Sequence, residues 1–184
     1  LVHFCRERGL RLISDEAYVA FRFAPRAIDT PARFDPGLET VIQLRSFSKT
    51  YAVCGWRIGY VLADRATSQR IAECQGSLLN PPNTLAQMAL ASIRDVPEVY
   101  SRDVKSQVLD RLRLVRGAIE HAGLNAELPD GGFYLWIDVH DRLEGSTYAN
   151  TAEWCAALAA RHGVGLWPGE DFGAPGWVRV SAVA

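Results

Sequence analysis

Residues 46–60 read SFSKTYAVCGWRIGY, a polar connection that contains Lys49. Apolar segments flank it on both sides: Thr40–Leu44 reads TVIQL and Arg57–Leu62 reads RIGYVL. A third apolar segment, Leu10–Ser14, lies further upstream. Short apolar strands with little alternation are typical of a sheet that is covered on both faces. We therefore expect three strands of an α/β sheet, with the polar connection joining the last two.

Lysine is rare in this chain. Of its 20 basic residues only Lys49 and Lys105 are lysines, and the others are arginines. The sequence thus uses arginine wherever the two types are interchangeable, but only a primary amine forms a Schiff base with a carbonyl group. The scarcity of lysine favours a chemical role for Lys49 over that of a solvated surface charge.

Polar side chains follow the ends of the first two predicted strands. Asp15 and Tyr18 come after the first strand, and Ser46 and Lys49 come after the second. Ligands of open α/β sheets bind beyond the carboxyl ends of the strands, and Arg57, which starts the third strand, can point into the same crevice. An acid, a phenol, an amine, a hydroxyl and a guanidinium together suit an aldehyde cofactor with a phosphate and a pyridine nitrogen. Pyridoxal phosphate is that molecule.

Three segments carry a resemblance to a known family. SDEAY (14–18), SFSKTYAVCGWRIGY (46–60) and PGEDFGAPGWVRVS (168–181) are similar to the class I/II pyridoxal-phosphate-dependent aminotransferases, which have fold type I of the aspartate aminotransferase superfamily. The resemblance covers nearly the whole chain but only the second half of the family's usual length. It implies part of the cofactor-binding large domain over residues 1–120, with a mixed, mostly parallel sheet and helices. It also implies a small, incomplete α+β domain over residues 121–184.

The resemblance implies a role for each matching residue. Lys49 would bind the cofactor covalently and then move the substrate proton, while Asp15 would keep the pyridine nitrogen protonated. Tyr18 would hydrogen-bond the phenolate oxygen of the ring. Ser46 and Arg57 would hold the phosphate, whereas Arg179 would bind the substrate carboxylate.

Each of these residues has a plainer interpretation when it is taken alone. Asp15 is then a loop carboxylate or a helix cap, Tyr18 is packing, Arg57 is a structural ion-pair partner and Arg179 is a surface charge. For Ser48 a turn role is favoured over a phosphate contact. The functional interpretation gains from the joint occurrence of the residues in the family's order and spacing.

The resemblance implies a transaminase that moves an amino group between an amino acid and a 2-oxo acid. Two alternatives stay open. One is another fold type I enzyme, such as a lyase, a racemase or a cyclase in natural-product synthesis. The other is the aminotransferase-like effector domain of a transcription regulator, which requires a basic winged-helix segment upstream. A cytoplasmic homodimer is expected for the full-length form, and this chain alone is expected to be an inactive fragment.

Composition narrows the possible partners. The net charge is −1 and the longest apolar runs fall well short of the ~20 residues that span a bilayer, so neither nucleic acid nor a membrane is an expected partner. The four cysteines are widely spaced, which favours free thiols in a reducing compartment over a disulfide framework. The four histidines form no ligand cluster, and no metal site is predicted.

The remaining elements follow from periodicity and from turn residues. Helices are predicted over 64–75, after an N-cap at Asn83, over 97–121 and over 151–162, and strands over 133–139, 164–167 and 177–182. Apolar residues every three or four positions give the long helix one buried face: Val104, Val108, Leu112, Val115 and Ile119.

Several residues of the small domain receive structural interpretations. Phe133, Tyr134 and Trp136 are expected in its core, although this strand could instead border the substrate. Glu170 and Asp171 are expected to be solvated turn charges. Trp167 is a candidate for substrate specificity, because it precedes a Pro-Gly turn and the strand that holds Arg179.

Overall fold

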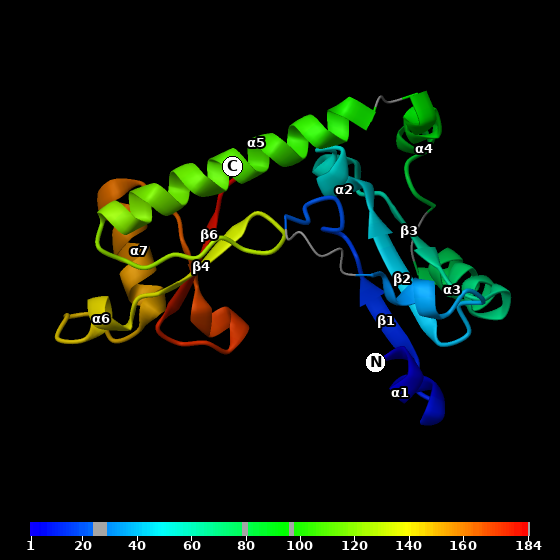
Figure 1. Ribbon diagram of the computed structural model, residues 1–184, viewed down its shortest axis with the longest axis horizontal. Helices are drawn as coiled ribbons and strands as arrows, with labels where there is room; N and C mark the ends of the chain where they lie inside the picture. Colours follow the sequence, from blue (N-terminus) through cyan, green and yellow to red (C-terminus); the bar gives the residue numbers. More distant parts are fainter. Residues whose placement is uncertain (24–28, 79–80, 96–97, 184) are drawn as a thin grey trace. The chain divides into compact units, whose positions relative to one another are not determined.

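The structure is a computed structural model that describes residues 1–23, 29–78, 81–95 and 98–183 (Figure 1). The chain separates into two compact units, Leu1–Arg102 and Asp103–Ala184. Each unit contains a three-stranded sheet with helices, so the predicted mixed α/β fold is confirmed. The units divide inside the long helix α5 (Glu98–His121), and a domain boundary near residue 120 stays a prediction.

The first unit contains one sheet in the order β1-β2-β3. Strand β1 pairs with β2 in parallel, and β2 pairs with β3 in antiparallel fashion. The described strands match the predicted ones to within two residues at each end. In chain order, with η for a 3-10 helix, the elements are α1 (Val2–Glu7), β1 (Leu12–Asp15), η1 (Pro31–Phe34), β2 (Val41–Ser46), α2 (Phe47–Thr50), η2 (Cys54–Trp56), β3 (Gly59–Leu62), α3 (Arg65–Leu78), α4 (Thr84–Ala91) and η3 (Ser92–Asp95).

Local chemistry sets the ends of the helices in this unit. Helix α1 ends before Gly9, whose φ of 62° lies in the left-handed region that favours glycine. Asn83 is the N-cap of α4, as predicted, and its side chain accepts a hydrogen bond from the Ala86 N–H. The predicted Pro97 start of the long helix lies outside the described residues.

The expected cover over both faces of this sheet is only partly provided by the described residues. Val41 and Gln43 of β2 are buried, but every residue of β3 is exposed and Ile13 of β1 is 64% exposed. Outside the strands, Phe21 is also buried, at 2% exposed. The buried centre of the unit is therefore the region around β2.

The second unit holds a fully antiparallel sheet in the order β4-β6-β5. Phe133, Leu135, Ile137 and Val139 are buried, whereas the residues that alternate with them lie on the opposite face. One face of the sheet is therefore the core of the unit. Besides α5, the elements are β4 (Tyr134–Asp138), α6 (His140–Leu143), α7 (Thr151–His162), β5 (Trp167–Pro168), η4 (Gly169–Phe172) and β6 (Trp177–Ser181).

The predicted apolar face of α5 is confirmed. Leu112 is fully buried, Val108 is 5% exposed, and the other three residues of the stripe are half-buried. The predicted strand over 164–167 is wrong for most of its length, because β5 contains only Trp167 and Pro168. Within the described ranges, no helix combines the length and the apolar character that a bilayer crossing requires.

Candidate functional site

The carboxyl ends of β1 and β2 lie at the same edge of the first sheet. Asp15 is the last residue of β1 and pairs with Leu44, two residues before β2 ends at Ser46. The single turn α2, which carries Lys49, follows directly beyond the end of β2 (Figure 1). The predicted placement of Asp15, Ser46 and Lys49 at one edge is therefore what the structure has.

Lys49 and Tyr18 come together from different segments. The Lys49 Nζ atom lies 5.9 Å from the centre of the Tyr18 ring, a distance at which an ammonium is attracted to an aromatic face. Lys49 is half-buried, and Tyr18 is 36% exposed. Asp15 is exposed, and its Oδ1 accepts a hydrogen bond from the Ala17 N–H at 3.1 Å. An amine, a phenol and an oriented carboxylate thus belong to one edge.

Ser46 is the N-cap of α2. Its Oγ accepts a hydrogen bond from the Ser48 N–H at 3.2 Å, which leaves the Ser46 O–H as a donor for another group. Ser48 is buried, and its carbonyl accepts from the Cys54 thiol at 3.2 Å. These contacts fix the turn around Lys49, and they agree with the turn role that the sequence favours for Ser48.

Arg57 differs in detail from the prediction. It does not start β3, because its backbone adopts the left-handed conformation at φ 54° and ψ 51°, which a strand cannot accommodate. Strand β3 begins at Gly59, opposite Ser46. A Cβ at Gly59 would lie 2.5 Å from the Arg45 carbonyl oxygen, so only glycine allows this close approach. The Arg57 side chain is exposed and donates to the Cys54 carbonyl at 3.0 Å.

A polar cluster around Glu16 escaped the sequence analysis. Glu16 is 8% exposed, and its Oε1 accepts hydrogen bonds from the Gln43 amide at 2.7 Å and from Ser14 and Thr30. The Arg45 Nη2 lies 2.9 Å from the Glu16 Oε2. Burial raises the pKa of Glu16, but the hydrogen bonds and the Arg45 charge outweigh it and leave the pKa below its ordinary value of 4.5.

The signal for this cluster was present in β2. Gln43 and Arg45 are polar residues two positions apart in a strand that begins with Val41 and Ile42, so they lie on one face of it. Glu16 directly follows Asp15, so a residue with structural contacts stands next to a candidate site residue at the end of β1. Asp15 is exposed at the end of β1, whereas the next residue, Glu16, is buried and joins this end to β2 through Gln43 and Arg45.

Arg179 lies in the second unit among aromatic rings. Its guanidinium carbon is 4.5 Å from the ring centre of Tyr134, 4.7 Å from that of Phe172 and 5.2 Å from that of Trp167. In the part of the chain that the structure describes, no carboxylate lies within ion-pair distance of Arg179. Its charge is therefore stabilised by rings.

Two expectations for the small domain are corrected. Phe133 is in the core, but Tyr134 is half-buried and Trp136 is 38% exposed, because alternation along β4 places both on the face opposite the core. Glu170 is no solvated turn charge either. It is half-buried, and its Oε1 accepts from the Thr151 N–H at 2.8 Å, at the first turn of α7. Asp171 is exposed, as predicted.

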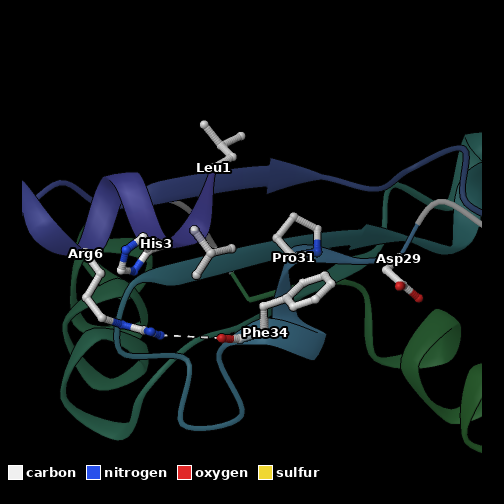
Figure 2. A pocket seen from close by; sticks show the side chains of 7 residues that line it. Leu1, His3, Arg6, Asp29, Pro31 and Phe34 are labelled. Atoms are coloured by element: carbon white, nitrogen blue, oxygen red, sulfur yellow. Dashed lines mark hydrogen bonds between the residues drawn. The ribbon is translucent and has the colours of Figure 1, made fainter.

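A hollow elsewhere in the first unit contains none of the predicted site residues. It measures about 500 Å³ and is lined by residues of α1 and η1, and Figure 2 shows the Arg6 side chain pointing toward the Phe34 carbonyl. Arg6 donates to the Phe34 carbonyl and forms an ion pair with Asp35 at 3.0 Å. Asp29 pairs with Arg33. Because these charges already have partners, the hollow offers little to a ligand.

Metal and disulfide chemistry find no support in the described residues. No group of three or more His, Cys, Asp or Glu side chains is arranged to hold an ion there. The four cysteines are free thiols in the structure, with Cys5 and Cys155 buried and Cys54 and Cys74 exposed.

Comparison with known proteins places the chain in a family. Residues 1–184 match the family described as aminotransferase class I and II. The chain is 29% identical, over 98% of its length, to a probable aspartate/prephenate aminotransferase of Aquifex aeolicus. It is 30% identical, over 94% of its length, to a valine–pyruvate aminotransferase of Mycobacterium tuberculosis. It spans 46% and 43% of these two relatives.

A solved structure supports the same assignment. The crystal structure of the aspartate aminotransferase of Thermotoga maritima superimposes with a TM-score of 0.85 at 26% identity. That match covers 100% of this chain and 46% of the other. The chain spans about half the length of the relatives it matches, and over its whole length it belongs to the aminotransferase class I and II family.

Proposed function

We propose that this chain supplies the second half of a pyridoxal-phosphate-dependent transaminase, which moves an amino group between an amino acid and a 2-oxo acid. The observation that carries the proposal is the position of Lys49. Its amine lies at the carboxyl edge of the sheet, over the Tyr18 ring and on the same edge as Asp15, in a chain whose whole length matches the family.

The side chains at this edge fit the cofactor. Pyridoxal phosphate supplies an aldehyde that an amine can attack, and a ring that withdraws electrons from the substrate's α-carbon. Lys49 is the amine that would hold it covalently and then carry the proton. Asp15 would stabilise the protonated pyridine nitrogen, and Tyr18 would donate to the phenolate oxygen. Ser46 has an O–H to give to a phosphate oxygen, and Arg57 has guanidinium donors beyond the one used by Cys54.

The second unit would supply the substrate's anchor. An arginine fork matches a carboxylate with two parallel N–H donors, which a lysine cannot do. Arg179 meets this need because its charge faces rings, and no carboxylate of the described residues pairs with it. We assign it the carboxylate shared by the amino acid and the 2-oxo acid.

The wider setting is also part of the proposal. We propose a cofactor-binding domain over residues 1–120 and a small domain over 121–184, in a homodimeric enzyme of amino-acid metabolism. The names of the relatives include aspartate, prephenate, valine and pyruvate, so they leave the substrate of this chain open. Four free thiols suit the reducing cytoplasm.

A labelling experiment tests the proposal, and the chain offers a matched control. The complete native protein is incubated with pyridoxal phosphate, reduced with borohydride and digested, and the modified peptide is identified by mass spectrometry. We expect the label on Lys49 and its loss in Lys49→Arg. Lys105→Arg, which changes the only other lysine of this chain, should keep it. A label on Lys105, or none on this chain, overturns the assignment.

A spectroscopic experiment separates the transaminase from other reactions. An amino acid alone should change the absorbance of the bound cofactor, and a 2-oxo acid alone should restore it. A lyase or a cyclase instead releases product without an amino acceptor. Product formation that does not depend on the acceptor would therefore contradict transamination while leaving the Lys49 assignment intact.

A further inference from the structure

The outer face of the second sheet is built around Arg179. The strand register places Trp136 of β4 and Trp167 of β5 directly opposite Arg179 of β6, so the three side chains form one row across the sheet. This face is opposite the buried one that carries Phe133 and Leu135. The row therefore belongs to a surface open to a ligand, with a cation at its centre.

Trp136, a member of this row, packs against two further aromatic rings. Trp136 stacks on Trp177, with ring centres 5.8 Å apart and planes within 10° of parallel. Trp136 also meets Phe172 edge-to-face at 5.7 Å. Both are favourable geometries for aromatic pairs. Since Phe172 in turn contacts Arg179, the rings hold the guanidinium in a defined place, so that less freedom is lost when a ligand binds.

Part of this aromatic surface stays available. Trp167 is 55% exposed and Phe172 is 48% exposed, although both contact Arg179. Exposed aromatic side chains are costly to leave in water and are enriched where a binding surface needs large rigid apolar area. A carboxylate bound to Arg179 would hold its attached group beside these two rings.

Charge on the same face argues against an acidic ligand. Asp138 lies two residues beyond Trp136 on the same side of β4 and is exposed, with its Oδ1 2.7 Å from the His140 Nδ1. Asp171, which directly precedes Phe172 in sequence, is exposed as well. A second carboxylate near these groups would be repelled, and Arg179 is the only cation in the three strands of this sheet. The face suits one carboxylate on an uncharged, apolar body.

We infer that Trp167, together with Phe172, is a specificity-determining residue that makes an aromatic or large apolar monocarboxylic amino acid, with its 2-oxo acid, the substrate class. The inference rests on the proposed function and deepens it. Trp167 stacks against the substrate's side chain while Arg179 binds its carboxylate. Acidic amino acids lack the apolar surface that this contact uses.

The test measures binding rather than turnover. Titration calorimetry on the complete cofactor-loaded protein gives dissociation constants for 3-phenylpropionate, acetate and succinate, which carry the carboxylate on an aromatic, a minimal and an acidic body. We expect 3-phenylpropionate to bind most tightly. Trp167→Val should reduce the preference for 3-phenylpropionate over acetate by roughly 3- to 10-fold. Trp167→Phe retains a ring and should keep most of the preference.

The outcomes separate this inference from the proposed function. Tighter binding of succinate than of 3-phenylpropionate overturns the inference, as does an equal loss for all three ligands in Trp167→Val. Both results leave the Lys49 label and the transaminase assignment standing. A missing Lys49 label with intact selectivity for 3-phenylpropionate removes the proposed reaction instead. Urea unfolding of each variant shows that a change in affinity does not come from a loss of folded protein.

Discussion

Glu16 and Arg179 are two charges that the protein holds in opposite ways. Glu16 is buried in the first unit, where Gln43, Ser14, Thr30 and Arg45 surround its carboxylate with donors. Arg179 lies in the second unit, where aromatic rings surround its guanidinium and no ion pair with a described residue uses its donors. The first charge has its partners within the fold, whereas the second keeps its hydrogen-bonding capacity for another molecule.

This difference predicts that Glu16 affects the stability of the fold, whereas Arg179 affects the binding of a ligand. A carboxylate that is hydrogen-bonded and ion-paired within its own protein contributes to folding, since its loss weakens the bonding of its buried partners. A guanidinium that is held by rings is oriented without having its donors used. We therefore expect substitutions at the two positions to act on different measurements, and the largest effect is expected at Glu16.

Glu16→Ala should reduce the free energy of unfolding by about 2–4 kcal/mol, because it removes the charged acceptor of the buried Gln43 amide, which keeps only Thr30, and the ion-pair partner of the part-buried Arg45. The urea midpoint of the complete protein measures this. Glu39→Ala, which removes an exposed carboxylate of the same unit, should change the free energy by no more than about 0.5 kcal/mol. Equal effects at the two positions would show that the Glu16 contacts add nothing.

Arg179→Leu should instead weaken ligand binding and leave the free energy of unfolding nearly unchanged. The loss of charge-assisted hydrogen bonds to a ligand carboxylate should weaken the binding of acetate and 3-phenylpropionate by roughly 10- to 100-fold. The urea midpoint should change little, because no described carboxylate loses an ion pair. Calorimetry and unfolding on the same preparation check both parts. A variant that unfolds easily but binds carboxylates normally would invert the comparison between Arg179 and Glu16.

The fold followed from the sequence wherever one periodic pattern dominated. The stripe on α5 was correct because Val108 and Leu112 face the core at helical spacing. In β4 the alternation also indicated the faces of the strand. Asp138 is two residues from Trp136 and four from Tyr134, so all three lie on one face, and a carboxylate predicts that this face is the outer one. Tyr134 and Trp136 were expected in the core because they are aromatic, although their position in the alternation places them on the outer face.

The sequence predicted only those parts of the candidate site that lie at the ends of strands. Asp15 and Lys49 were placed at one edge, because the carboxyl ends of parallel strands coincide. The Glu16 cluster was missed because it joins positions far apart in the chain: the polar residues of β2 indicate that polar partners exist, but not which side chains meet them. The rings around Arg179 depend on the register of three strands, which becomes definite only in the folded sheet.

The smallest expected effect is a pH dependence that distinguishes Glu16 from other carboxylates. Its pKa is lowered in the folded protein, so its contribution to stability is fully present above the unfolded value of 4.5 and is lost as the pH falls through the folded value. Glu16→Gln should therefore lower the urea midpoint by a constant amount at pH 6–7. The gap between variant and wild type should narrow below about pH 4.5, because protonation makes the native side chain neutral as well.

Glu39→Gln serves as the charge-matched control for this pH series. A gap for Glu16→Gln that stays constant down to pH 3 would mean that the loss of stability in the variant does not come from the loss of the Glu16 charge. The donors around it would then act through shape and hydrogen bonding alone. A gap that narrows identifies the ion pair with Arg45 as a real part of the link between β1 and β2, the two strands whose ends carry Asp15 and Ser46.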